Sequence, residues 1–386
     1  MCSVQVMVND LGRRRRLTTG AALLVLSLGS TLALPGAASG ASPVCGQKLA
    51  VMGALSGPAR ALGTDIRRGV LLAIAQYNQA HPGCGVGLVD ADTQGNPVQA
   101  PARASQLVDD AAVIGVVGPA FSGEALASGQ TFADAGLPTI TPSATNPAVS
   151  AQGWRTFHRL ISSDTGFDPL LGHYIHSTLG RRRVAVVIDD SDYGITFARG
   201  VRRALGSVAV VTLRVHTGQT VFGGTVRAVH AARADAVVYG GYYPEAGRLA
   251  RQLSASGFGG SFIGGDGIAD PAFATLAGPR AARHTYFVDG FVPPDLRPSF
   301  TSAYEAKFAS SPGIYSLEAY DAAEVFLQGI GDGAGTRATM LSWVNGYHGT
   351  GLTKPIAFTT RGELVRQPAW IYKPQNGGIV LRAHLS

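Results

Sequence analysis

Hydroxyl groups follow two of the apolar runs that predict strands. Ser122 comes shortly after the run that ends at Gly118, and it opens a predicted helix. A ligand carboxylate placed there would meet a hydroxyl, free backbone N–H groups and the positive end of the helix dipole. Ser122 could also act only as the N-cap of that helix. The loop Thr141–Pro147, held extended by its prolines, offers hydroxyls that either complete the carboxylate site or cap the next turn.

A carboxylate and three tyrosines could bind the rest of such a ligand. Asp266 follows another predicted strand, and the glycines on both sides of it let a ligand or a backbone segment come close. In a cleft its charge would neutralise an ammonium group, because a buried charge needs a partner. Its alternative role is a turn aspartate. Tyr193, Tyr242 and Tyr315 could wall an apolar pocket, or each could belong to ordinary packing.

The sequence lacks the common catalytic and metal-binding motifs. The glycines of Gly83–Gly87 precede a predicted strand instead of following one, which is the wrong context for a dinucleotide fingerprint. A Walker-type phosphate loop, a His-Glu-x-x-His helix and a Gly-x-Ser-x-Gly elbow are missing. His173 and His176 have no visible third ligand, and the spacing of Asp189–Asp192 does not fit an EF-hand loop. We therefore expect no bound metal, no cofactor and no enzyme.

The elements that must position these residues alternate between short apolar runs and helical patterns. Strands are predicted at Leu49–Leu55, Val86–Asp90, Val113–Gly118, Val184–Ile188, Val208–Leu213, Ala236–Tyr239 and Ser261–Ile263. Helices are predicted at Asp65–Gln79, Pro97–Asp109, Gly123–Ala135, Phe167–Leu179, Ile195–Leu205, Thr225–Ala232 and Pro244–Ser256. Strands of Val, Ile and Ala with little alternation indicate sheets buried on both faces, and the βαβα order predicts doubly wound parallel sheets. The alternation of strand and helix patterns is interrupted near residues 154–164, and a mostly helical section runs through residues 298–343. This layout predicts two α/β lobes, with the chain crossing between them more than once.

The amino terminus predicts export. Arg13–Arg16 precede an apolar stretch from Leu17 to Leu34, and small residues follow it up to Ala41. This is the order of a cleavable signal peptide, with a retained membrane anchor as the alternative. The chain has 32 Lys and Arg against 25 Asp and Glu. Residues 1–41 hold four Arg and one Asp, so the remaining chain has 28 basic and 24 acidic residues and a net charge of +4. Such a mildly basic chain has no basic stripe for nucleic acid.

Two cysteines remain after that cleavage. Cys45 and Cys84 each lie just before a predicted strand. In a βαβ unit these strand starts share one edge of the sheet, so the two sulfurs could meet. In an oxidising compartment we expect them to form a disulfide, and two unpaired thiols are the alternative. A bridge across this loop would stabilise the fold by about 4 kcal/mol in the chain-entropy model.

Five motifs in the correct order resemble the type I periplasmic binding proteins, specifically the branch that binds leucine, isoleucine and valine. They are Gly53–Pro58, Ile140–Thr145, Asp192–Gly194, Tyr239–Glu245 and Tyr320–Ala322. The resemblance covers essentially the whole mature chain. It implies two doubly wound parallel-sheet lobes joined by a multi-strand hinge. Lobe 1 would comprise residues 42–162 plus 291–361 and lobe 2 residues 163–290 plus 362–386, after a signal peptide at residues 1–41.

The resemblance also implies roles for the candidate residues. The ligand α-carboxylate would be held, partly through backbone groups, by Ser122, Ser143, Ala144 and Thr145. Asp266 would face the α-ammonium group, at a position where the branch usually carries Glu.

The remaining roles concern the ligand side chain. The resemblance implies that Tyr193 closes over the ligand from the second lobe, with Tyr242 and Tyr315 near its side chain. Leu62 stands where an aromatic residue often contacts the ligand, and Glu124 must point away from the carboxylate site or be offset. The amino acid is therefore not fixed by the motifs.

The function that the resemblance implies is the extracytoplasmic substrate-binding component of an ABC importer. The protein would capture a small, branched-chain-like amino acid by hinge closure and deliver it to a membrane permease. We expect a monomer, periplasmic or extracellular, with no nucleic-acid partner. The alternatives are a ligand-sensing receptor module for amides or small carboxylates and a secreted hydrolase using Ser122 or Ser143. Neither serine has an identifiable His and acid partner.

Overall fold

Parallel strands build a first sheet in the computed structural model, which describes residues 45–375 and 378–385. The strands of this sheet are β1 Lys48–Gly53, β2 Gly87–Asp92, β3 Val113–Val117, β4 Thr139–Thr141 and β5 Phe157–Arg159. Their order is β2-β1-β3-β4-β5, and every pairing is parallel. The predicted signal peptide, residues 1–41, lies outside the described residues.

Helices cover both faces of the first sheet, because its central strands are buried on both sides. Leu49 and Val51 of β1 belong to a core shared with the helices α1 Arg60–Ala80, α12 Ser316–Gly331 and α13 Arg337–Asn345. Ala50 and Met52 belong to a separate core with α2 Ala100–Asp109 and α3 Ser122–Asp134. Successive residues of β1 therefore contribute to opposite faces, as the two-residue period of a strand requires.

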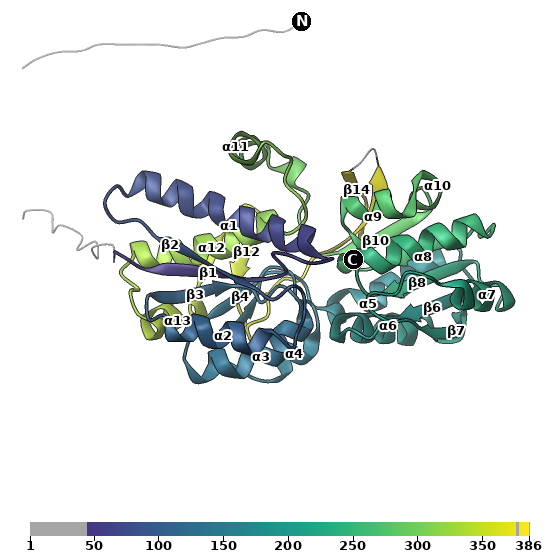
Figure 1. The fold of residues 1–386 in the computed structure, drawn as a ribbon, viewed down its shortest axis with the longest axis horizontal. Helices are drawn as coiled ribbons and strands as arrows, with labels where there is room; N and C mark the ends of the chain where they lie inside the picture. Colours follow the sequence, from purple (N-terminus) through teal and green to yellow (C-terminus); the bar gives the residue numbers. More distant parts are fainter. Residues whose placement is uncertain (1–44, 376–377, 386) are drawn as a thin grey trace, which may run out of the picture. The chain divides into compact units, whose positions relative to one another are not determined.

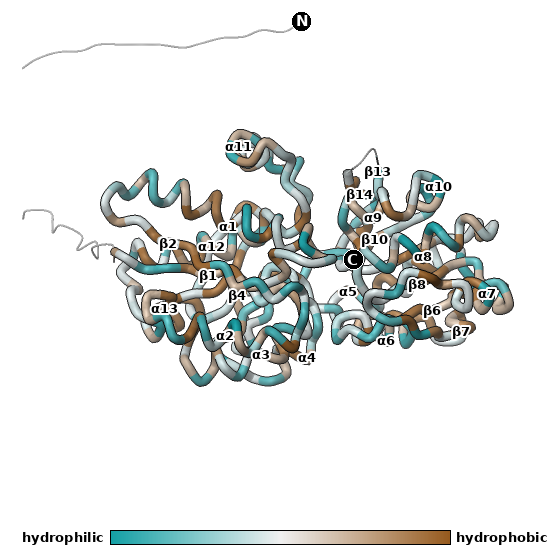
Figure 2. Tube along the Cα trace, in the orientation of Figure 1, coloured by the Kyte–Doolittle hydropathy of each residue, from teal (hydrophilic) through white to brown (hydrophobic). Residues whose placement is uncertain are grey.

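A second sheet is mostly parallel. Its strands are β6 Val184–Ile188, β7 Ala209–Arg214, β8 Ala236–Gly240, β9 Ser261–Gly264, β10 Thr285–Asp289, β13 Ala369–Gln375 and β14 Gly378–Leu385. Their order is β14-β13-β10-β9-β8-β6-β7. The chain-terminal strands β13 and β14 pair antiparallel, and the other strands pair parallel to one another. Figure 2 shows hydrophobic colour along β6 and β8, as expected for strands covered on both faces.

The helices of the second sheet also divide between two cores. One core joins the sheet to α5 Asp164–His173 and α6 Asp192–Leu205, and the other joins it to α7 Gly223–Ala231, α8 Tyr243–Ala255 and α9 Pro271–Ala277. The remaining elements are α4 Pro147–Ala151, α10 Pro279–Ala282, α11 Pro298–Phe308, β11 His348–Thr350 and β12 Pro355–Ala357, the π-helical turn η1 Tyr174–Thr178, and the 3₁₀ turns η2 Gly206–Val208, η3 Asp266–Ile268 and η4 Pro294–Leu296. Among the described residues, no helix is long and apolar enough to cross a membrane.

The chain passes between the two sheets three times. It leaves the first sheet after β5, returns after β10 to form α12 and α13, and enters the second sheet again at β13. Figure 1 follows this path by colour, from the purple β1 to the yellow β14. The predicted doubly wound α/β architecture is confirmed.

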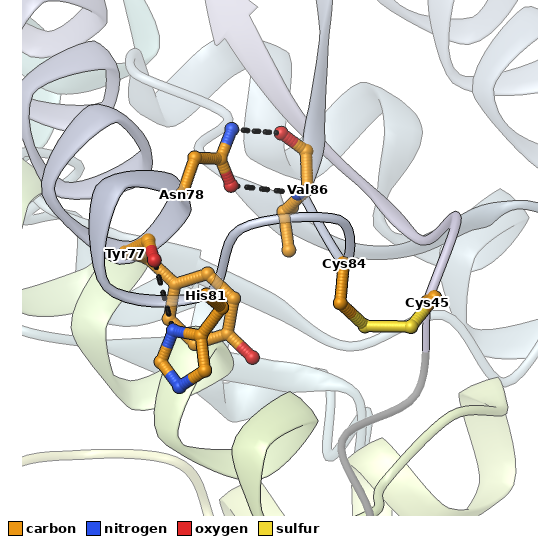
Figure 3. Close-up of a disulfide and its surroundings, with 6 residues drawn as sticks. All are labelled: Cys45, Tyr77, Asn78, His81, Cys84 and Val86. Atoms are coloured by element: carbon orange, nitrogen blue, oxygen red, sulfur yellow. Dashed lines mark hydrogen bonds between the residues drawn. A yellow bond between two sulfur atoms is a disulfide. The ribbon is translucent and has the colours of Figure 1, made fainter.

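A disulfide joins Cys45 to Cys84 at the start of the first two strands, as the sequence predicts (Figure 3). The two Cα atoms lie 4.7 Å apart. The same turn is held by Asn78 of α1, whose side-chain amide accepts a hydrogen bond from the Val86 backbone N–H and donates another to the Val86 carbonyl (Figure 3). The bridge therefore lies at the amino-terminal edge of the first sheet, and the carboxyl ends of its strands lie at the other edge.

Candidate functional site

Loops at the carboxyl ends of strands in both sheets enclose one small cavity. The space in it that no atom occupies is about 280 Å³. The residues that line it are Leu62, Ile66, Ala120, Phe121, Ser122, Ser143, Tyr193, Tyr242, Asp266, Gly267 and Tyr315. Six of the eight predicted ligand-binding residues are among them. Those are Ser122, Ser143, Tyr193, Tyr242, Asp266 and Tyr315.

Two serine hydroxyls occupy the side of the cavity formed by the first sheet. Ser122 is the first residue of α3, and its Oγ accepts a weak, 3.3 Å hydrogen bond from the backbone N–H of Asn146. Ser143 Oγ donates a 2.7 Å hydrogen bond to the carbonyl of Ala120. Both hydroxyls are therefore held in place by backbone groups, and both are buried.

The two other predicted carboxylate-binding residues, Ala144 and Thr145, are buried but do not line the cavity. The carbonyl of Ala144 accepts a 2.8 Å hydrogen bond from the buried guanidinium of Arg159, which in turn pairs with Glu363. The carbonyl of Thr145 accepts from the backbone N–H of Asp164. In this structure, both residues help to fix the loop that carries Ser143.

Asp266 occupies the opposite side of the cavity, at the end of β9. Its Oδ2 accepts a 2.7 Å hydrogen bond from the hydroxyl of Tyr315, whereas no described residue donates a hydrogen bond to Oδ1. Tyr315 has a positive φ of 64°, a conformation that costs a non-glycine residue about 1–2 kcal/mol. The surrounding packing holds this strained backbone so that the tyrosine hydroxyl reaches Asp266.

Glycines beside Asp266 allow Tyr193 to approach closely. A Cβ atom added at Gly265 would lie 2.3 Å from the Tyr193 hydroxyl, and one added at Gly267 would lie 2.6 Å from the Tyr193 ring. The hydroxyl of Tyr193 accepts a 3.2 Å hydrogen bond from the Gly267 N–H. The Gly-Gly-Asp-Gly sequence thus brings the tyrosine of one loop against the backbone of another.

Asp266 influences two further buried carboxylates, Asp164 and Asp289. Burial raises the pKa of Asp266 to about 6. Burial, followed by the charge of Asp266, raises the pKa of Asp164 to about 8 and that of Asp289 well above its ordinary value. Burial therefore disfavours the charged form of all three carboxylates.

Glu124, expected to point away from the carboxylate site, is held outside the cavity by hydrogen bonds to its carboxylate. Its carboxylate accepts hydrogen bonds from the Thr93 hydroxyl and from the backbone N–H of Phe121. Burial raises the pKa of Glu124 to about 7, so its charge is reduced at neutral pH. The residue caps α3 and positions Phe121.

Four of the lining residues, Ile66, Ala120, Phe121 and Gly267, were not predicted for the site, and Leu62 was named only as a departure at a ligand-contact position of the family. Leu62 and Ile66 lie four residues apart on α1, so they share one face of that helix. Ala120 and Phe121 lie between β3 and Ser122, and Gly267 follows Asp266. The helical spacing of Leu62 and Ile66 and the place of Phe121 after a strand were the available signals, but both also fit ordinary core packing.

The cavity lining combines hydroxyl groups, one carboxylate and an apolar surface, which suits a small molecule with both polar and apolar parts. Its lining, all of it in the described part of the chain, contains no Lys, Arg or His. Apolar contacts come from Leu62, Ile66, Ala120 and Phe121, and the aromatic rings of Phe121, Tyr242 and Tyr193 follow one another with centroid distances of 4.9 and 5.3 Å.

Comparisons with known proteins agree with this geometry. A family model described as periplasmic binding protein matches residues 46–378. The chain is 29% identical over 307 residues to a leucine-, isoleucine-, valine-, threonine- and alanine-binding protein of Pseudomonas aeruginosa, a match that covers 78% of this chain and 82% of that protein. It is 30% identical over 337 residues to a Leu/Ile/Val-binding protein of Rhizobium johnstonii, with 84% and 91% covered.

A solved structure also resembles this chain over most of its length. The branched-chain amino acid transporter substrate binding protein of Streptococcus pneumoniae, determined in complex with isoleucine, superposes with a TM-score of 0.80 at 26% sequence identity. The match covers 87% of this chain and 99% of that one.

Proposed function

This chain belongs to the periplasmic binding protein family, and from that membership we propose that it captures a small apolar amino acid for an ABC importer. Proteins of this family bind solutes for transporters and are not enzymes, so the hydrolase alternative is set aside. One observation supports the ligand class best. The buried Asp266 carboxylate and the Ser122 hydroxyl, at the start of α3, line the same small cavity.

We assign the α-carboxylate to the side of the cavity at Ser122 and Ser143. There a negative group meets hydroxyls and the positive end of a 13-residue helix. The raised pKa of Glu124 in the first turn reduces the repulsion that this carboxylate would otherwise produce.

We assign the α-ammonium to Asp266. A carboxylate buried to 3% exposure needs a cationic partner, and the lining supplies none from the described residues. Tyr315 keeps the carboxylate in one orientation. Leu62, Ile66 and Phe121 then face an apolar side chain, which favours the amino acids named for the relatives, such as leucine, isoleucine and valine.

Closure of two lobes over the ligand is the proposed mechanism. Tyr243, at the start of α8, donates a 2.8 Å hydrogen bond to the carbonyl of Pro58, after β1. Asn146 donates 3.0 Å hydrogen bonds to the Asp192 carbonyl and the Thr196 hydroxyl. These contacts join loops of the first sheet to helices of the second. For the two lobes we propose residues 42–162 plus 291–361 and residues 163–290 plus 362–386.

Proteins of this family are exported and act with ABC permeases. For this chain we propose that residues 1–41 are the signal peptide and that the mature protein is a monomer that binds no nucleic acid.

A thermal-shift screen tests the function. The protein is stripped of bound ligand by unfolding and refolding, then mixed with amino acids, their amides and small carboxylates. A ligand at about 100 times its Kd stabilises the folded state by about 2.7 kcal/mol, which raises the melting temperature. The proposal predicts shifts with branched-chain amino acids and none with their amides. A response only to amides or to carboxylates without an amino group would contradict it.

A further inference from the structure

A second, larger cavity adjoins the proposed ligand site. This outer chamber measures about 1160 Å³ by the same measure that gives about 280 Å³ for the ligand cavity. The two cavities have two lining residues in common, Phe121 and Tyr242. We define these two rings as the aromatic wall.

The aromatic wall is made by one ring from each sheet. Phe121 is the N-cap residue of α3, and Tyr242 is the N-cap residue of α8. Their rings meet edge to face, with centroids 4.9 Å apart and an interplanar angle of 76°. This is a favourable aromatic geometry, worth about 0.5–1.5 kcal/mol beyond the buried area.

Neighbouring residues hold both sides of the aromatic wall in place. Glu124 accepts a hydrogen bond from the Phe121 backbone N–H and is itself bound by Thr93. Tyr242 packs against Tyr193 at 5.3 Å and follows Gly241, whose φ of +146° is accessible to glycine. The wall is therefore a positioned element and not a pair of mobile surface rings.

The outer chamber has acidic side chains and no basic ones among the lining residues that the structure describes. Four of its residues are acidic, namely Glu124, Asp190, Asp192 and Glu245, and its described lining contains no Lys or Arg. Gln94 and Asn96 add amide groups. A cationic group that reached this chamber would be favoured electrostatically.

We propose that the aromatic wall sets the length of the side chain that the protein accepts, and that it separates the site from a chamber suited to a cationic side-chain terminus. This inference rests on the proposed amino-acid function. When Asp266 and Ser122 hold the amino acid, a compact apolar side chain extends as far as the aromatic wall. The long side chains of arginine and lysine would have to pass it.

Isothermal titration of the refolded protein with leucine, lysine and arginine tests the proposal. In Phe121→Ala, arginine and lysine should gain at least about tenfold in affinity, because the space beyond the wall becomes accessible. Leucine should lose about tenfold, because an apolar contact is removed. Phe121→Leu keeps an apolar side chain but loses the aromatic pair, so it should change the affinities in the same directions as Phe121→Ala and by less.

Phe308→Ala is the matched control. Phe308 packs edge to face against Tyr304, with ring centroids 4.7 Å apart, and it lines neither cavity. Phe308→Ala therefore removes a similar aromatic pair and leaves the aromatic wall intact. The inference is overturned if the wild type binds arginine as tightly as leucine. It is also overturned if the folded Phe121→Ala variant shows no gain in affinity for lysine or for arginine. If the wild type binds no amino acid at all, the proposed function fails and this inference fails with it.

Discussion

Tyr315 donates a 2.7 Å hydrogen bond to Oδ2 of Asp266, and its helix-capping backbone adopts a positive φ to do so. The relationship joins a residue after β9 to a residue 49 positions later, at the start of α12. We propose that this hydroxyl orients the carboxylate that lines the cavity and that Oδ1 meets the ligand ammonium.

Removal of this hydroxyl should weaken ligand binding while the ring remains. A hydrogen bond to a charged group contributes about 1.5–3 kcal/mol, so Tyr315→Phe should raise the Kd for leucine about tenfold or more. Tyr320→Phe is the control, because the Tyr320 hydroxyl bonds to Gln76 on the surface. Equal affinities for the two variants would remove the hydroxyl of Tyr315 from the site.

Affinity should depend on pH through Asp266. The pKa of Asp266 is raised by burial to about 6, and only the ionised carboxylate pairs with an ammonium group. Binding should therefore be strong above pH 6 and should weaken as the pH falls through about 6. Titrations between pH 4.5 and 8 in matched ionic strength check this. Constant affinity down to pH 4.5 would show that Asp266 does not meet the ligand cation.

The interlobe contacts of Asn146 should contribute to closure. Asn146→Asp keeps the side-chain oxygen that accepts from the Ala148 N–H, but it removes the amide that donates to Asp192 and Thr196. Two hydrogen bonds are lost at about 1 kcal/mol each, so we expect about 30-fold weaker binding while the helix cap is unchanged. The ligand-bound variant should also scatter X-rays as a more open molecule. Wild-type affinity would contradict a role in closure.

The disulfide should affect stability and leave binding unchanged. Cys45 and Cys84 are 39 residues apart, and a loop of this length corresponds to about 4 kcal/mol in the chain-entropy model. Urea unfolding of the double serine variant should show a loss of this order, and the reduced wild type should match it. Because the bridge lies at the edge opposite the cavity, leucine affinity should be retained in the folded variant. A loss of affinity without a loss of stability would contradict this account.

The sequence was most informative where strands are buried on both faces. The runs at Val113–Val117 and Val184–Ile188 contain only apolar residues and glycine, so they could be recognised directly. The antiparallel strands β13 and β14 were not predicted, because they carry Pro374, Arg382 and other partly exposed polar residues at one end of the sheet. Such strands are defined by pairing with a partner and less by their own composition.

The candidate site could be predicted only in part for a similar reason. Ser122 and Asp266 follow strands and so lie at the edge where ligands bind in α/β sheets. Whether a loop residue such as Thr145 faces the cavity depends on how the loop is bonded, here to Arg159 and Asp164, which lie later in the chain. Phe121 is a core-type residue in the sequence, and its function becomes visible when the opposite ring, Tyr242, is in place.

The most direct test of the account is isothermal titration of leucine into the refolded wild type, Asp266→Asn and Asp270→Asn at pH 7.5. Asp270 is a buried carboxylate too, but it caps α9 and does not line the cavity, and asparagine can keep its capping bond. The account predicts that Asp266→Asn weakens binding at least about 100-fold, because the ammonium loses its buried partner, while Asp270→Asn binds as the wild type. Wild-type affinity in Asp266→Asn would contradict the assignment of Asp266 as the ammonium partner.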